Sequence, residues 1–132
     1  MRLLVVDDDP SLRTALQMVF EDAGHEVWLA ASVAEARAHL ERAHVDATLI
    51  DAGVSGSGVA LWRELEADHR WTGRVLLLTG NLPSLGLLRS HARVIAKPFD
   101  YGVLLHYLEE LGAAAFYDQG VPTDSLTSTP SA

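Results

Sequence analysis

The sequence contains no cysteine, which excludes disulfide bonds and metal sites built on thiolates. It also lacks an apolar run of about 18 residues, the length that a membrane-spanning helix requires. The first residues, MRLLVVDD, do not contain the long apolar core of a secretory signal peptide. These absences predict a cytoplasmic protein with no membrane span.

Basic residues are scarce as well. The chain has 10 Lys and Arg against 18 Asp and Glu, which gives a formal net charge of −8. Nucleic-acid binding requires a basic surface, so we expect no direct nucleic-acid partner. The hydrophobic fraction, 48% of 132 residues, is sufficient for the core of one domain. We assign this domain to residues 1–116 and predict that residues 117–132, rich in Ser, Thr and Pro, form a flexible tail or linker.

Short apolar runs alternate with helical patterns along the chain. The predicted strands are Arg2–Val6, Glu26–Ala31, Val45–Ile50, Arg74–Thr79 and Arg93–Ala96. The predicted helices begin at Pro10, Ser32, Val59, Ser84 and Asp100. This alternation is typical of an α/β protein and predicts a doubly wound sheet of five parallel strands.

Several residues define where these helices begin and end. Asp9 is suited to cap the first helix, and Pro10 then takes its first position, where a missing N–H has no cost. Ser32 and Glu35 have the spacing of a capping box for the second helix. Asp100 is the expected cap of the last helix, and Gly24 is the expected end of the first.

Four predicted strands end in polar side chains. Asp7 and Asp8 follow the first strand, Asp51 ends the third, Thr79 ends the fourth and Lys97 follows the fifth. In an open α/β sheet the ligand site lies outside the carboxyl ends of the strands. We therefore expect carboxylates, a hydroxyl and an ammonium group to share one pocket.

The expected group of carboxylates requires a cation. Two like charges 4 Å apart repel by about 4 kcal/mol at an effective dielectric of 20. Mg²⁺ meets this need, because it binds carboxylate oxygens and accepts phosphate oxygens in its remaining positions. Lys97 is suited to act as a point charge on a phosphate, and the Pro98 that follows it is compatible with a cis peptide bond.

Four segments resemble the signature of the receiver domain of two-component response regulators, the CheY-like domains. They are Leu4–Pro10 (LVVDDDP), Leu49–Asp51 (LID), Leu77–Thr79 (LLT) and Ala96–Phe99 (AKPF). The resemblance covers residues 2–112 and implies a flavodoxin-like fold. It also implies a signalling domain rather than an enzyme, one that assists its own phosphorylation and dephosphorylation.

The resemblance assigns a role to each residue of the predicted site. Asp51 would accept a phosphoryl group from a histidine kinase or a histidine phosphotransfer protein. Asp8 would bind Mg²⁺ directly, Asp7 would act mostly through water, and the backbone carbonyl of Gly53 would complete the protein ligands. Thr79 and Lys97 would contact the phosphoryl oxygens. The signal would pass to a downstream protein or to a fused output or kinase domain.

The loop after the predicted phosphoacceptor departs from the family pattern. Ser55 stands where the family usually has proline, and Gly58 comes one residue early. Val94 stands where the family usually has the Tyr or Phe that changes rotamer with the threonine. We therefore expect phosphorylation chemistry to be retained and the usual output switch to be altered.

The spacing between the last two site residues is also unusual. Lys97 follows Thr79 by 18 positions. This is shorter than the family spacing by about four residues, or one helical turn. The helix that begins at Ser84 is therefore expected to be short.

Two other functions remain open. The letters DDDPSL resemble the first motif of haloacid dehalogenase-type phosphatases, in which Asp7 would be the nucleophile and Asp9 the acid/base, with Thr79 and Lys97 in the second and third motifs. That assignment leaves Asp51 without a role and requires an acidic pair at the end of a strand after Lys97, which the sequence does not have. The other alternative is a receiver-like docking domain that is never phosphorylated.

The remaining candidate residues favour structural roles. The six histidines follow no metal-ligand spacing and are expected on the solvated surface. The tryptophans, Trp28, Trp62 and Trp71, are expected to cover faces of the sheet or of helices. The stretch Ala113–Tyr117 either extends the last helix with an apolar surface or simply ends it.

Overall fold

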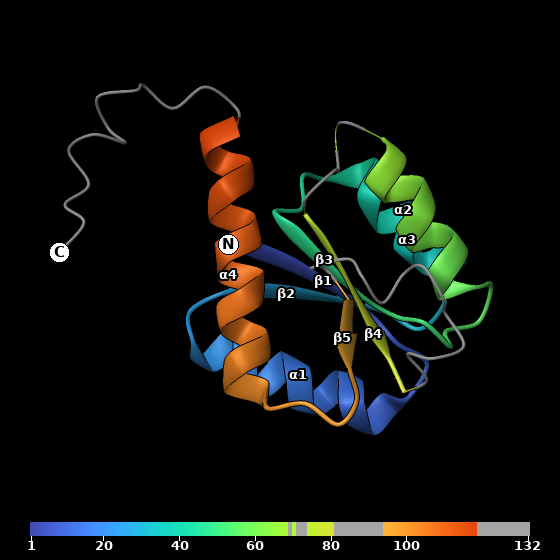
Figure 1. The fold of residues 1–132 in the computed structure, drawn as a ribbon, viewed down its shortest axis with the longest axis horizontal. Coiled ribbons are helices and arrows are strands. Elements are labelled where there is room, and N and C mark those ends of the chain that lie inside the picture. The colour runs from blue at the N-terminus through green and yellow to red at the C-terminus, as the bar shows by residue number, and fades with distance from the viewer. Residues whose placement is uncertain (69, 71–73, 81–93, 119–132) are drawn as a thin grey trace, which may run out of the picture.

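The computed structural model of the chain describes residues 1–68, 70, 74–80 and 94–118 (Figure 1). Its elements, in order, are β1 (Arg2–Val6), α1 (Pro10–Asp22), β2 (Glu26–Ala30), α2 (Val33–Arg42), β3 (Ala47–Asp51), α3 (Gly58–Ala67), β4 (Val75–Thr79), β5 (Val94–Ala96) and α4 (Tyr101–Asp118).

All five strands form one parallel sheet in the order β2-β1-β3-β4-β5. Helices α1 and α4 cover one face of the sheet, and α2 and α3 cover the other (Figure 1). The predicted doubly wound, flavodoxin-like fold is confirmed. In this strand order, the switch point at which ligands bind lies between β1 and β3.

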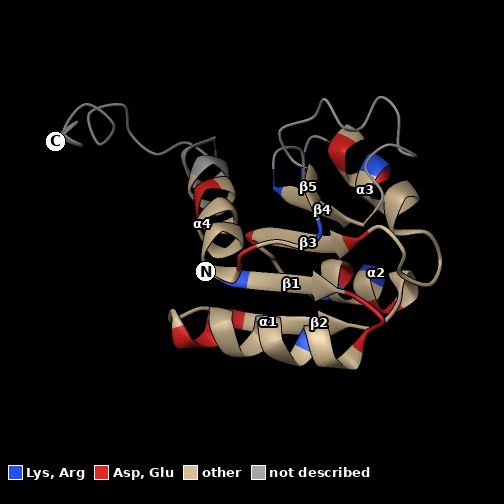
Figure 2. Ribbon diagram, turned by 60° about the horizontal axis from the view of Figure 1, so that its bottom comes forward, with Lys and Arg blue, Asp and Glu red and all other residues tan. Residues whose placement is uncertain are grey.

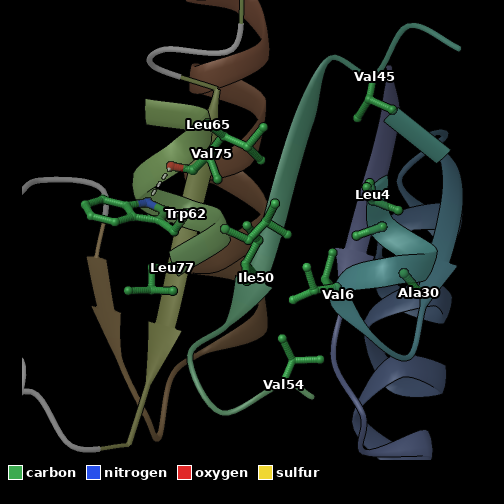
Figure 3. Close-up of a cluster of buried hydrophobic side chains, with 13 residues drawn as sticks. Leu4, Val6, Ala30, Val45, Ile50, Val54, Trp62, Leu65, Val75 and Leu77 are labelled. Atoms are coloured by element: carbon green, nitrogen blue, oxygen red, sulfur yellow. Dashed lines mark hydrogen bonds between the residues drawn. The ribbon is translucent and has the colours of Figure 1, made fainter. Parts of the chain in front are cut away.

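Each face of the sheet has its own core. The core beneath α2 and α3 includes Leu4, Ile50, Leu61 and Trp62 (Figure 3). Trp62 is 2% exposed, and its indole N–H donates to the carbonyl of Val75 at 3.4 Å. This is the role predicted for it, covering a face of the sheet.

The opposite core lies beneath α1 and α4. It contains buried leucines from the sheet and from the two helices that cover it, including Leu16 of α1, Leu49 of β3 and Leu104 of α4. Because the central strands are covered on both sides, they read as nearly continuous apolar runs in the sequence.

The predicted caps are present. Asp9 accepts hydrogen bonds from the N–H groups of Ser11 and Leu12, and Asp100 accepts one from Val103. Ser32 Oγ accepts from the Glu35 N–H at 3.2 Å, and the Glu35 carboxylate accepts from the Ala31 N–H at 3.0 Å. Ser32 therefore caps α2 as predicted, while Glu35 reaches back to the residue before the cap rather than to the Ser32 N–H of a standard capping box.

Three predictions fall outside the described residues. They concern the helix from Ser84, the surroundings of His69, Trp71 and His91, and the tail beyond Asp118. Helix α4 continues to Asp118, past residue 116, where we placed the domain boundary. The stretch Ala113–Tyr117 therefore extends this helix. Among the described residues, no helix is both long and apolar enough to cross a membrane.

The histidine prediction holds for His44 and His106, whose side chains are 55% and 70% exposed. It is wrong for His25, whose side chain is 11% exposed. Its Nε2 lies 2.8 Å from Glu109 of α4, so it links two segments far apart in the sequence. His39 is half-buried, with Nε2 3.0 Å from the carbonyl of Leu29.

Candidate functional site

The predicted site residues gather at the carboxyl edge of the sheet. Figure 2 shows acidic segments, in red, along the turn beyond β1 and at the end of β3. One carboxylate oxygen from each of Asp7, Asp8 and Asp51 lies within 4.8 Å of the others. The parallel topology places the ends of β1 and β3 next to each other, so these three side chains meet although the sequence separates them.

Asp7 is the most deeply held of the three acids, with 2% of its surface exposed. Its N–H donates to the carbonyl of Ala30 at 3.0 Å, and its Oδ1 accepts from the N–H of Asp9 at 2.8 Å. Its own carbonyl accepts from Nη1 of Arg13 at 2.8 Å. Within the described part of the chain, Oδ2 has no hydrogen-bond partner although it is buried.

The electrostatics around Asp7 favour the neutral acid. Burial raises the pKa of the Asp7 carboxyl above its ordinary value, against the hydrogen bond from Asp9, and the charges of Asp51 and Asp8 raise it further. The charge of Lys97 lowers this pKa in part, and a cation bound at the acidic cluster would lower it further.

The donor set fits Mg²⁺. This ion prefers carboxylate oxygens and retains several waters or phosphate oxygens. Asp7 and Asp51 are buried while Asp8 is exposed, so the cluster is open to solvent on one side. Asp7, Asp8 and Asp51 are the residues that would hold the ion.

Lys97 contacts Asp51 from the other side. Its Nζ lies 2.6 Å from Asp51 Oδ1. Burial lowers the pKa of Lys97, but the hydrogen bond to Asp51 and the charges of Asp51, Asp7 and Asp9 outweigh burial and raise it above its ordinary value. Lys97, the only lysine in the sequence, is therefore fully charged at neutral pH.

Backbone contacts fix the position of this lysine. The N–H of Lys97 donates to the carbonyl of Thr79 at 2.7 Å, and Ala96 pairs with Thr79 in the sheet. The Lys97–Pro98 peptide bond is cis. Thr79 is the last residue of β4 and is 3% exposed, so the two predicted phosphoryl contacts stand at neighbouring strand ends.

Gly53 lies beside the Asp51 carboxylate. A Cβ at this position would stand 3.4 Å from Asp51 Oδ2, in ordinary van der Waals contact. Gly53 is exposed, and its lack of a side chain leaves this approach to Asp51 open. The structure thus brings Gly53, Asp7, Asp8 and Lys97 around Asp51.

Arg13 was missed by the sequence reasoning. Its guanidinium donates to the carbonyl of the peptide that joins Asp7 to Asp8, and so helps to orient both acids. The available signal was its place on the capped first helix, one turn after Asp9, whose carbonyl accepts the Arg13 N–H at 3.0 Å.

The comparisons with known proteins agree with this geometry. Residues 3–109 match the family model of the response regulator receiver domain. An acidic pocket at the switch point of a β2-β1-β3-β4-β5 sheet is the site of that class of protein. The chain belongs to the response regulator receiver domains, the CheY-like domains of two-component signalling.

Several solved structures share the fold. A putative response regulator from Chloroflexus aurantiacus J-10-fl is 29% identical, with a TM-score of 0.73 over 85% of this chain and 97% of that one. A receiver domain of a sensor histidine kinase from Pseudomonas aeruginosa PAO1, with a magnesium ion coordinated in its active-site cleft, is 25% identical, with a TM-score of 0.72 and the same coverage. A CheY-like receiver domain protein from Methanospirillum hungatei JF-1 is 24% identical, with a TM-score of 0.74 over 89% and 97%. No curated protein matches the chain.

Proposed function

We propose that the chain is a phosphoacceptor receiver that takes a phosphoryl group onto Asp51 from a histidine kinase or a histidine phosphotransfer protein. The observation that carries the proposal is the setting of the Asp51 carboxylate. It lies 2.6 Å from a charged lysine and within 4.8 Å of two acids, one of which has a buried oxygen without a partner. A cytoplasmic location belongs to the proposal.

The reaction is an in-line displacement at phosphorus. A carboxylate oxygen of Asp51 forms a bond to phosphorus as the bond from phosphorus to the donor imidazole nitrogen breaks, and that nitrogen keeps the electron pair. Mg²⁺, when bound, neutralises part of the charge of the carboxylates and the phosphoryl oxygens. Lys97 is held where it neutralises further charge, and Thr79 offers a hydroxyl to a phosphoryl oxygen.

The donor approaches over the pocket beside Lys97. This pocket is lined by Asp9, Leu12, Lys97, Pro98, Phe99 and Tyr101. Its apolar side chains include Tyr101, which is 39% exposed at the start of α4. An apolar rim around a charged centre suits a protein partner that presents a histidine.

The phosphatase alternative is weaker. It uses Asp9 as acid/base, whereas Oδ1 of Asp9 accepts the N–H groups of Ser11 and Leu12 as the cap of α1. The receiver-domain family model, in contrast, matches residues 3–109. The phosphatase assignment also leaves the Asp51–Lys97 contact without a purpose.

Phosphorylation at Asp51 is tested with acetyl phosphate and Mg²⁺. We expect the intact mass to increase by one phosphoryl group, and this increase to disappear with a chelator or in Asp51→Asn. Thermal unfolding of Asp51→Asn serves as the folding control. A phosphoryl group that still appears on folded Asp51→Asn would disprove the proposal. Turnover of p-nitrophenyl phosphate that depends on Asp7 alone would favour the phosphatase.

Lys97→Met tests two roles of the lysine, its stabilisation of the transferred phosphoryl group and its contact with the Asp51 carboxylate. Phosphorylation by acetyl phosphate should slow by roughly 100-fold, the usual effect of removing one charge-stabilising donor from an active site. Mg²⁺ should bind more tightly, because the cation that contacts Asp51 Oδ1 is gone. Isothermal titration and the mass assay measure the two effects. Lys97→Arg, which keeps the charge, should show a smaller change in both, and equal Mg²⁺ affinity in all three proteins would contradict the assignment.

A further inference from the structure

The loop from Ala52 to Ser57 carries Gly53, the proposed carbonyl ligand, but its composition provides little stiffness. It contains two glycines and two serines, and Ser55 stands in place of the family proline. Two of its hydrogen bonds close local turns. They run from the Val54 N–H to the Asp51 carbonyl at 3.2 Å and from the Ser57 N–H to the Val54 carbonyl at 3.1 Å. These turns do not tie the loop to the rest of the domain.

The amino end of α2 supplies that connection. The N–H of Val33 donates to the carbonyl of Ser55 at 3.0 Å, and Ser32 and Ser55 form an isolated parallel bridge. Among the described residues, the loop makes further backbone hydrogen bonds to other elements at its two ends, from the Ala52 N–H to the Leu78 carbonyl at 2.7 Å and from the Leu61 N–H of α3 to the Ser57 carbonyl at 3.2 Å. Gly53 thus lies between two points fixed on the sheet and on α2.

Side chains reinforce the same contact. Val33 and Val54 are both buried in the core cluster beneath α2 and α3, which Val54 enters from the loop after β3 (Figure 3). Gly56 faces Val33 closely, since a Cβ at Gly56 would lie 3.0 Å from the Val33 Cβ. The residues on either side of Val33 are fixed by two hydrogen bonds, from the Glu35 N–H to Ser32 Oγ and from the Ala31 N–H to the Glu35 carboxylate.

We propose that the amino end of α2, through the N–H of Val33, positions the loop that carries Gly53 and thereby the metal site. This inference rests on the proposed function, because it concerns the loop next to the phosphoacceptor. In this proposal the hydrogen bond from Val33 restricts the loop, as a proline at position 55 would. Because coupling between two sites is reciprocal, binding at the acidic cluster also stabilises the start of α2.

Val33→Pro removes this N–H and also replaces the buried valine side chain. Proline is well tolerated at the first position of a helix. The preceding residue, Ser32, already has the extended conformation that proline requires, with φ −154° and ψ 166°. Val33→Ala is the matched control, because it keeps the N–H and trims the buried side chain.

Isothermal titration with Mg²⁺ compares the three proteins. Val33→Pro should weaken Mg²⁺ binding by about tenfold, the usual effect of losing an outer-shell contact. Val33→Ala should lower the thermal midpoint yet bind Mg²⁺ nearly as wild type does. Wild-type affinity in Val33→Pro, or an equal loss in both variants, would overturn the proposal. If the wild-type protein binds Mg²⁺ tightly but is never phosphorylated, the proposed function is refuted. The comparison of Mg²⁺ affinity among wild type, Val33→Pro and Val33→Ala then still tests the role of Val33.

Hydrogen exchange of the wild-type protein tests the same link without a substitution. Mg²⁺ at about ten times its Kd should slow exchange of the Val33 amide by about tenfold, since the opening that frees this N–H then has to release the ion. The Ala43 amide, bonded to the His39 carbonyl at the far end of α2, should be unaffected. Unchanged exchange at Val33 in a protein that binds Mg²⁺ would refute the coupling.

Discussion

Asp7→Asn is expected to stabilise the metal-free protein while bringing Mg²⁺ binding below detection. Asparagine keeps the shape and an oxygen for the Asp9 N–H, but it removes a charge that is buried beside Asp8 and Asp51. The gain in the free energy of unfolding should be about 1 kcal/mol, as when a functional site is relieved of its built-in repulsion. The loss of Mg²⁺ follows because the buried Oδ2 has no hydrogen-bond partner among the described residues, so the substitution removes the oxygen best placed to bind the ion.

The pH dependence of this gain identifies its cause. Burial raises the pKa of Asp7 in the folded protein above its unfolded value, so the ionised group opposes folding at neutral pH. As the pH falls through the raised pKa, Asp7 becomes neutral and this cost disappears. The difference between wild type and Asp7→Asn should therefore shrink on acidification, and urea unfolding in a chelator at several pH values measures it.

Asp8→Asn is the matched control for this pair of effects. Asp8 is exposed, so its neutralisation should change stability less while still weakening Mg²⁺ binding. Two results would contradict the conclusion that the buried charge of Asp7 destabilises the metal-free protein. One is an Asp7→Asn variant less stable than wild type at neutral pH, and the other is a stability difference that does not depend on pH.

The fold was predictable because local and global signals agree. The run Leu3–Val6 is apolar on both faces and is buried on both, and Asp9 and Ser32 mark helix starts that the structure contains. The convergence of Asp7, Asp8 and Asp51 was predictable from parallel topology alone, since carboxyl ends of such strands share an edge.

Other features depend on contacts that leave no local signal. The largely buried ring of His25 contacts the amino group of Met1 and the carboxylate of Glu109, which are 24 and 84 positions away, and no nearby sequence pattern indicates these contacts. The bond between Val33, the first residue of α2, and Ser55 is likewise between backbone groups, so the side chains do not specify it. Sequence reasoning identified the missing proline at position 55 but could not identify the contact that holds the loop.

The early glycine has a structural consequence that can be tested. With one residue fewer in the loop, Ser57 closes it in a left-handed conformation, at φ 71°, and caps α3 by accepting the Ala60 N–H at 3.3 Å. Gly58, the first residue of α3, then passes directly over the backbone of Asp51. The departure from the family spacing is thus accommodated at Asp51, the proposed phosphoacceptor.

Gly58→Ala is expected to be among the most destabilising single-methyl changes in the chain. The added Cβ would lie 2.0 Å from the carbonyl oxygen of Asp51 and 3.1 Å from Cγ2 of Ile50. Because the first of these atoms is backbone in a central strand, the helix has to move, at a cost of about 3 kcal/mol. Urea unfolding should show this loss, and the mass assay should show slower phosphorylation because Asp51 is displaced.

Gly53→Ala, in the same loop, separates this clash from a general effect of adding a methyl group. Its Cβ would make an ordinary contact of 3.4 Å with Asp51 Oδ2, so its stability should remain within about 0.5 kcal/mol of wild type. If Gly58→Ala were as stable as Gly53→Ala, the close approach of α3 to Asp51 could not be what fixes the phosphoacceptor strand.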